Sequence, residues 1–372
     1  MADEAENEDQ LFNRLAELTS LAGPSGFEEP VLRAMRSELE PLCDSVEVDI
    51  RGNVCGQQNA AGSAASAEEP PLRIMLTAHA DQIGFLITSI LRKGFLRFTR
   101  IGGPTLMVLP GQQVQVLTEQ GPLEGVIGVR PGHVIRSADE ARQVPALEDL
   151  YIDIGAESAG EAAEWGVRQG TPAVFAGELV RTRHPRRCFG PSVDNRMGCL
   201  VVAEVARRLQ GEQLSSTRLY SIVVEEEIGL RGAAVAAQSL QPDVVLAIDT
   251  VPAGGTPDLR PDALPWEIGG GPLIKVRETR GLATHNRLRQ LILQTAREQD
   301  LPVQLIVDTA GATDATSAQQ ASGAVAAGVI GLARRYSHSA VEMFDLGDLS
   351  AIIDLTTAVI RGLHSREQLR RI

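Results

Sequence analysis

The chain is poor in aromatic residues, in basic charge and in paired cysteines, and each shortage excludes a class of protein. Aromatics make up 3% of the 372 residues, so the core must be built from Val, Leu, Ile and Ala. The formal net charge of -13 leaves no basic surplus to neutralise phosphates, and we expect no nucleic-acid partner. The four cysteines include no C-x-x-C pair, which excludes zinc ribbons and thioredoxin motifs and favours reduced thiols.

Segments that direct a chain to or through a membrane are also missing. The acidic stretch over residues 1–10 has neither the basic start nor the apolar stretch of a secretory signal. No apolar run reaches the roughly 18–20 residues of a membrane helix. The sequence therefore predicts a cytoplasmic protein without a membrane partner.

The length of the chain and a change in its composition and pattern near residue 85 predict two domains. Residues 183–372 alternate strands with helices, and residues 1–84 add helices and a buried strand over 72–78. Together they predict an α/β domain with a mostly parallel mixed sheet covered by helices. Residues 85–182 are punctuated by Gly and Pro and rich in Val, Ile and Thr, which predicts an inserted small β-barrel domain. Residues 59–71 are expected to form a loop.

The first forty residues predict two helices after a short tail. Residues 1–9 are expected to fray, and a stripe of leucines over 11–21 predicts the first helix. Ser25 and Glu28 have the spacing of a capping box, so a second helix is expected to begin there and run to about Leu39.

Polar residues follow the predicted strands of the α/β domain, where the carboxyl ends of strands commonly form sites. Two histidines and several carboxylates on one edge predict a two-metal site for zinc, cobalt or manganese. Two ions about 3.5–4 Å apart would activate a water and polarise a carbonyl, and one free carboxylate would move the proton. The residues in question are His79, Asp81, Asp194, Glu225, Glu226, Glu227, Asp249 and His338.

Each of these residues also has an ordinary structural explanation. A histidine at a strand end is more often a buried structural residue, and a carboxylate there often caps the next helix. Three consecutive glutamates usually face solvent. Here they lie between the apolar runs 222–224 and 228–230, where clustered like charges call for a cation.

Seven motifs, spread almost from end to end, resemble one known family. In this order and spacing they make the chain similar to the tetrahedral aminopeptidases, also called glutamyl or deblocking aminopeptidases, some of whose relatives are labelled cellulase. The motifs are Gly23–Glu28, Asp49–Asn53, Ala78–Asp81, Tyr151–Ala156, Asp194–Arg196, Glu226–Ala233 and Arg335–Ser339.

The resemblance implies a role for each candidate residue. Glu226 would be the general base for the attacking water and then protonate the leaving amine. Asp81 would orient the His79 imidazole through its other ring nitrogen. The implied cofactor is a pair of divalent ions, zinc first, with cobalt and manganese as alternatives. The implied metal ligands are His79, Asp194, Glu227, Asp249 and His338, with Asp194 bridging the ions, His79 and Asp249 completing one site and Glu227 and His338 the other.

The resemblance also implies a substrate and an assembly. The substrate would be a short peptide, hydrolysed at its first bond, and the fold would be that of a di-zinc exopeptidase. Residues 85–182 would contribute contacts in a homo-oligomer, from a dimer to a tetrahedral dodecamer. The chain departs from the family at Gln82, where Glu is usual, at Glu225, where Gln is usual, and at Ala312, where Gly is expected before Thr313 and Asp314. The first two changes together move one negative charge across the site.

Three alternatives stay open. A related deacylase, deblocking enzyme or carboxypeptidase would share the ligand set but recognise an acyl or a carboxylate end of its substrate. A glycoside hydrolase needs two unligated carboxylates and aromatic platforms, for which two Trp and three Tyr offer little. A scaffold without activity would have no need of the intact ligand set.

Overall fold

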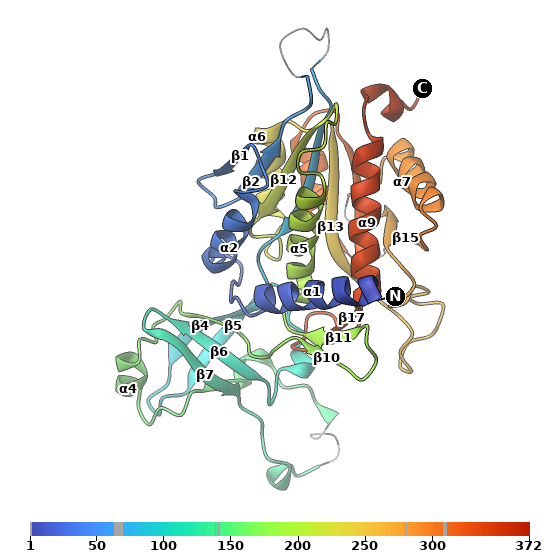
Figure 1. Ribbon diagram of the computed structural model, residues 1–372. Coiled ribbons are helices and arrows are strands. Elements are labelled where there is room, and N and C mark those ends of the chain that lie inside the picture. Colours follow the sequence, from blue (N-terminus) through green and yellow to red (C-terminus); the bar gives the residue numbers. More distant parts are fainter. Residues whose placement is uncertain (1, 63–69, 138, 140–141, 280, 308–310) are drawn as a thin grey trace.

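The computed structural model describes residues 2–62, 70–137, 139, 142–279, 281–307 and 311–372. This part of the chain forms a large sheet with helices on both faces and a smaller barrel near one end of that sheet (Figure 1). The loop predicted over 59–71 lies mostly outside the described residues. No described helix has the length and apolar content needed to cross a membrane.

The large sheet is mixed, with a parallel centre. The strands β12, β3, β13 and β16 are parallel neighbours, while β2 and β14 pair antiparallel at their flanks. The central strands are almost wholly buried, as expected of parallel strands covered on both faces. The order across the sheet is β1 (Ser45–Val48), β2 (Val54–Gln58), β12 (Thr217–Val223), β3 (Arg73–His79), β13 (Val244–Pro252), β16 (Ala326–Arg334), β14 (Leu273–Arg277) and β15 (Gln304–Val307).

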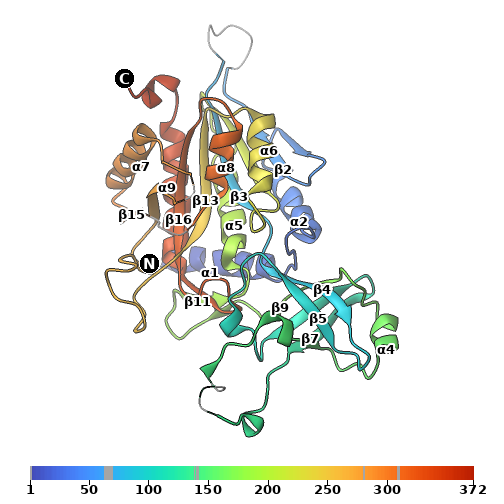
Figure 2. The ribbon, with the colours of Figure 1, turned by 180° about the vertical axis from the view of Figure 1, so that it is seen from behind.

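Helices cover both faces of this sheet (Figures 1 and 2). In α7 the buried residues Leu288, Ile292 and Ala296 recur every four positions, which places one apolar stripe against the sheet. One face carries α1 (Ala2–Thr19), α2 (Glu29–Leu39), α5 (Val193–Arg208), α7 (Asn286–Glu298) and α9 (Leu346–Gly362), and the other carries α6 (Arg231–Leu240) and α8 (Asp314–Ala321).

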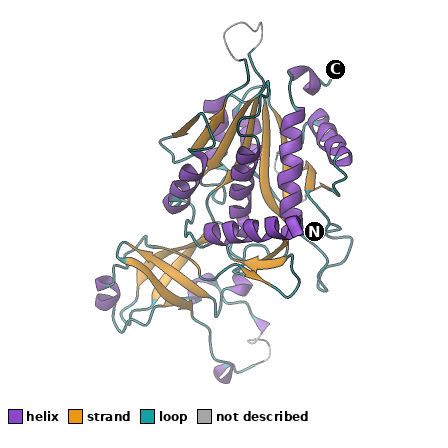
Figure 3. Ribbon diagram, viewed as in Figure 1, coloured by secondary structure: helices purple, strands orange, loops and turns teal. Residues whose placement is uncertain are grey.

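A closed six-stranded barrel interrupts the α/β part, as predicted (Figure 3). Three phenylalanines pack together in its mainly aliphatic core, where the Phe85 ring lies edge-on to Phe98 and Phe175 at 5.1 and 5.2 Å between ring centres. The domain bounds 85–182 stay a prediction. The strands follow the order β4 (Gly84–Ile90), β5 (Leu96–Ile101), β8 (Ile152–Asp153), β7 (Gly121–Ile127), β6 (Gln113–Thr118) and β9 (Pro172–Phe175), and α4 (Ala159–Glu164) lies beside them.

A three-stranded sheet forms between the barrel and the last helix. The strand β11 pairs with both β10 and β17, so that residues near 188 and 344 lie side by side. The strands are β10 (Val180–Arg181), β11 (Arg187–Gly190) and β17 (Glu342–Asp345), and short 3-10 helices span Leu106–Val108, Gly132–Val134, Leu147–Asp149 and Arg366–Leu369.

Two local predictions at the N-terminus are wrong. The first helix begins at Ala2, so the described residues 2–9 are helical and not a frayed tail. Its acidic residues have partners, because Glu8 lies 2.8 Å from Arg186 and Asp9 lies 2.5 Å from Arg181. The second helix is confirmed.

The capping box predicted for that second helix is absent. The hydroxyl of Ser25 donates to Asp81 at 2.6 Å, and the Glu28 side chain makes no capping bond to the helix. These two side chains thus support the region around the candidate site.

Candidate metal centre

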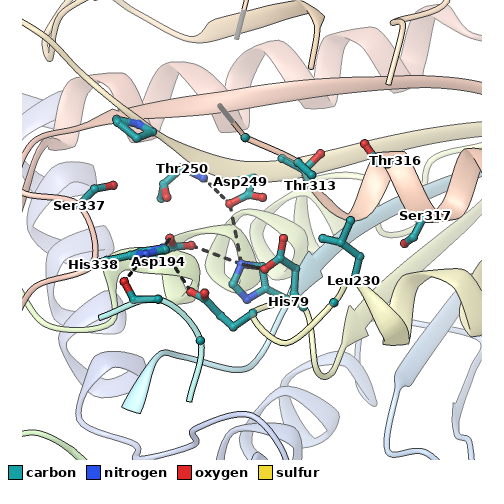
Figure 4. A pocket seen from close by; sticks show the side chains of 18 of the residues that line it. His79, Asp194, Leu230, Asp249, Thr250, Thr313, Thr316, Ser317, Ser337 and His338 are labelled. Carbon is teal, nitrogen blue, oxygen red and sulfur yellow. Dashed lines mark hydrogen bonds and ion pairs between the residues drawn. The ribbon is translucent and has the colours of Figure 1, made fainter. Parts of the chain in front are cut away.

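Seven of the eight candidate site residues come together at the carboxyl edge of the central strands. His79 ends β3, Asp249 lies inside β13, and Glu226 and Glu227 follow β12. Asp194 stands at the start of α5, beside the cis peptide bond that joins it to Asn195, and His338 lies in the turn after β16. Six of them line one cavity of about 860 Å³ (Figure 4), whereas Asp81 is fully buried and does not line it.

The cavity-lining residues form two clusters. We call His79, Glu226 and Asp249 the inner cluster and Asp194, Glu227 and His338 the outer cluster, and within each the potential ligand atoms lie within 4.8 Å of one another. In the inner cluster, Nε2 of His79 lies 3.8 Å from Asp249 and 4.0 Å from Glu226. In the outer cluster, Nε2 of His338 lies 3.6 Å from Asp194 and 3.6 Å from Glu227.

Asp194 faces both clusters. Its Oδ1 lies 3.3 Å from Nε2 of His79, and its Oδ2 lies 3.6 Å from Nε2 of His338 (Figure 4). A carboxylate whose two oxygens approach two different imidazoles is placed to bridge two cations.

The donor set fits divalent cations. Oδ1 of Asp194 and Oε1 of Glu227 are buried and have no hydrogen-bond partner among the described residues. Buried carboxylate oxygens are normally hydrogen-bonded or bound to a metal, because leaving them unpaired is costly. Imidazole nitrogens beside carboxylate oxygens are the ligands of zinc, cobalt and manganese sites.

Comparison with known proteins identifies the family. Residues 59–355 match the M42 glutamyl aminopeptidase family. The chain belongs to this family. A lysyl aminopeptidase of Pyrococcus furiosus is 33% identical over 343 residues, covering 92% of this chain and 94% of the relative. An aminopeptidase of the archaeon Desulfurococcus kamchatkensis has a similar structure, with a TM-score of 0.90, 34% identity and 98% of each chain covered.

A third similar structure is the TET1 peptidase of Pyrococcus horikoshii, with a TM-score of 0.82 and 30% identity over 95% of this chain and 100% of that one. That peptidase can assemble into a tetrahedron or a large octahedral shell. The M42 chain described here is accordingly a metal-dependent aminopeptidase, a hydrolase of peptide bonds.

Asp81 connects three parts of this M42 site. It is fully buried, and its carboxylate accepts the backbone N–H groups of Glu226 and Glu227, each at 3.0 Å. Nδ1 of His79 lies 3.4 Å from the Asp81 carboxylate and 3.1 Å from its carbonyl oxygen, so Nε2 is left facing the cavity. Asp81 therefore contacts the His79 ring, and it also holds the backbone of the two glutamates, which the sequence did not indicate.

The barrel side contributes to the outer cluster. The carbonyl oxygen of Gly103, just after β5, accepts from Nδ1 of His338 at 3.1 Å, which leaves Nε2 free for the cluster. Space is tight here: a Cβ on Gly103 would lie 3.0 Å from that nitrogen, and one on Gly102 would lie 3.1 Å from Glu227. Glycines therefore allow the barrel end to approach the site closely.

Burial and close charges shift the pKa values of the site. Burial raises the pKa of Glu226 well above its usual value and that of Glu227 to about 8. Burial would lower the pKa of His338, but Asp194 and Glu227 outweigh it and raise the pKa to about 9. Burial also opposes ionisation of Asp194, yet Arg334 beside it holds its pKa well below the usual value. Such perturbed groups are typical of functional sites.

Gln82 and Glu225, at which the chain departs from the family pattern, each contact an arginine. Gln82 accepts from Arg196 at 2.8 Å beneath the site. The Glu225 carboxylate points away, toward Arg51 at 2.7 Å and Arg231 at 3.5 Å. Each change is therefore accommodated locally.

Sequence reasoning missed Arg334 and assigned no role to Asp314, and the structure places both near the site. Arg334 lines the cavity and contacts Asp194 at 2.8 Å. An arginine directly after the apolar run 326–333 could have signalled a buried charge. Asp314 is buried and does not line the cavity, whereas its neighbour Thr313 does. The four remaining histidines do not line it either.

Proposed function

We propose that this aminopeptidase holds two divalent ions, with zinc as the preferred metal, and uses Glu226 as its general base. The observation that carries the proposal is the position of Asp194, whose two oxygens face the two histidines. His79 and Asp249 would complete the inner site, and Glu227 and His338 the outer one.

Glu226 is assigned as the base although it lies in the inner cluster. Asp194 gives that cluster a third ligand besides His79 and Asp249, so the Glu226 carboxylate is free for proton transfer. Two ions bound here would polarise the scissile carbonyl and lower the pKa of the attacking water. Glu226 would accept the proton of that water and release it to the leaving amine.

We propose a short peptide with a free N-terminus as the substrate. The lining of the cavity supports this over a polysaccharide, since no Trp or Tyr is among its described lining residues. We further propose that the chain assembles into a homo-oligomer through the barrel part, residues 85–182. The assembly named for the similar TET1 peptidase supports that proposal.

Release of free amino acids from an unblocked peptide tests the function. The assay would use zinc- or cobalt-loaded protein, an N-acetylated twin of the peptide, and the Glu226→Gln variant. We expect stepwise release from the free peptide only, and a loss of about 10²–10⁴-fold in kcat in the variant, the usual contribution of a general base. Glu225→Gln is the matched control, because its carboxylate points toward Arg51 and Arg231.

The other outcomes point to other enzymes. Cleavage of the acetylated twin at its first bond would favour a deblocking enzyme or deacylase. Unchanged release by Glu226→Gln would remove the assignment of the base. Absence of release from either peptide with metal bound would overturn the proposed reaction.

A further inference from the structure

A buried ion pair lies beneath the outer cluster and has no part in the proposed reaction. Arg334 ends β16, and its side chain is 2% exposed. Its Nη2 lies 2.8 Å from Oδ2 of Asp194 and donates to Ser337 at 2.5 Å, while its Nη1 contacts the Glu342 carboxylate. Arginine suits such a position because its planar donors can serve several acceptors at once.

Glu342 holds the backbone of two members of the outer cluster. Its carboxylate accepts the N–H of Asp194 and the N–H of His338, each at 3.0 Å. His338 and Tyr336 have φ values of 56° and 59°, a left-handed conformation that residues other than glycine rarely adopt. The bonds from Glu342 and Arg334 therefore fix a turn that the local sequence would not hold by itself.

The two oxygens of Asp194 differ because of this pair. Oδ1 faces the inner cluster and has no hydrogen-bond partner among the described residues. Oδ2 faces the outer cluster and already lies against the guanidinium of Arg334. A cation bound by the outer cluster must share Oδ2 with Arg334, and like charges in a poorly solvated site repel strongly.

We propose that Arg334 is a positioning residue that makes the two metal sites unequal, lowering the affinity of the outer cluster so that the inner cluster fills first. Glu342 acts in the opposite sense, because its negative charge offsets that of Arg334. The inference rests on the proposed two-ion site. It makes the outer ion the exchangeable one, so that the supply of metal would set the fraction of fully loaded enzyme.

Metal binding by the full chain, without any substrate, tests this directly. Metal-free protein would be titrated calorimetrically with Mn²⁺ alone, and the ions per chain would be counted by mass spectrometry at each step. The wild-type chain should bind in two steps, the first tighter. Arg334→Met should tighten the second step by about tenfold and leave the first unchanged, in the range known for residues that support metal ligands.

Two variants that change the affinity of the second binding step in opposite directions separate this electrostatic effect from a merely structural one. Glu342→Gln keeps an acceptor for the two N–H groups but removes the offsetting charge, so it should weaken the second step. Weakening in both variants would mean that the pair only holds the turn, and would overturn the proposal. Two equal steps in the wild-type chain would overturn it as well.

Two further variants guard against trivial results. Removing one partner of a buried ion pair can unfold a protein. The double variant Arg334→Met/Glu342→Gln removes both charges. Its affinity for the second ion should lie between those of the two single variants. Arg335→Met is the matched control, because this guanidinium donates to the carbonyls of Gly254 and Gly255 and should affect neither step. Unequal binding without peptide hydrolysis would overturn the proposed function and leave this inference standing.

Discussion

The inner and outer clusters are built in different ways. The inner cluster stands on neighbouring parallel strands, and its His79 side chain is 1% exposed. The outer cluster depends on a left-handed turn and on the barrel-side Gly103, and its His338 side chain is 34% exposed. The first is fixed by the core of one sheet, and the second by contacts between distant parts of the chain. We therefore expect the outer cluster to be the more easily altered.

Removal of the central histidine of the inner cluster should have the largest effect. His79→Ala deletes the imidazole that approaches Asp194, Asp249 and Glu226. An ion contributes several kcal/mol of transition-state stabilisation, so kcat/KM should fall by roughly 10³-fold or more. Peptide hydrolysis and the zinc content per chain would measure this. The exposed His133→Ala is the control, and retention of two zinc ions with full activity in His79→Ala would contradict the assignment.

Loss of the Asp81 carboxylate should have the next largest effect. Asp81→Asn leaves one side-chain oxygen, which cannot accept the N–H groups of both Glu226 and Glu227 as the two carboxylate oxygens do. It also removes the negative charge beside His79. Metal affinity should fall by about 10–100-fold, as for other residues that support ligands. Titration of metal-free protein would measure it, and Asp49→Asn, at a turn outside the cavity, is the control. Unchanged affinity would show that the backbone alone positions these residues.

A methyl group on the barrel side should affect one cluster only. Gly103→Ala places a Cβ 3.0 Å from Nδ1 of His338, so the ring must move. The second binding step should weaken by about tenfold, and the first should not change. Gly132→Ala is the matched control, because nothing lies within 4 Å of its added Cβ. Equal weakening of both steps would argue against separate construction of the clusters.

The difference between the inner and outer clusters also explains which site residues could be predicted from the sequence. The inner residues end or follow apolar strand segments, so His79, Asp249 and the glutamates at 226–227 could be recognised from local pattern. The contact of His338 with Gly103 joins residues 235 positions apart, and no local pattern contains it. Arg334 was missed because its partners Asp194 and Glu342 come from two other elements.

Strand β14 and the start of α2 show two further limits of local sequence pattern. The strand β14 contains Lys275, which is buried with Glu278 lying 2.8 Å from its Nζ. A lysine in a short apolar run does not indicate a buried strand. Likewise, Ser25 and Glu28 have capping-box spacing, but Asp81 and the Glu225 N–H provide stronger long-range partners. Tertiary contacts decided the roles of Ser25 and Glu28.

The smallest expected effect concerns stability at the back of the inner cluster. Glu28 accepts the N–H groups of Gly26 and Glu225, and burial raises its pKa from 4.5 to about 7. A carboxyl group whose pKa is raised on folding contributes stability below its unfolded pKa, near 4.5, and loses it as the pH rises through about 7.

The wild-type chain should therefore lose about 1–2 kcal/mol of unfolding free energy from this group between pH 5 and pH 8, after allowance for solvent screening. Glu28→Gln keeps an acceptor oxygen and has no charge, so its stability should lack this decline. Thermal unfolding across that range would measure the difference, with the exposed neighbour Glu29→Gln as control. Parallel curves for wild type and Glu28→Gln would mean that Glu28 stays ionised in the folded protein, and that the support behind the inner cluster, unlike its ligands, is not sensitive to pH.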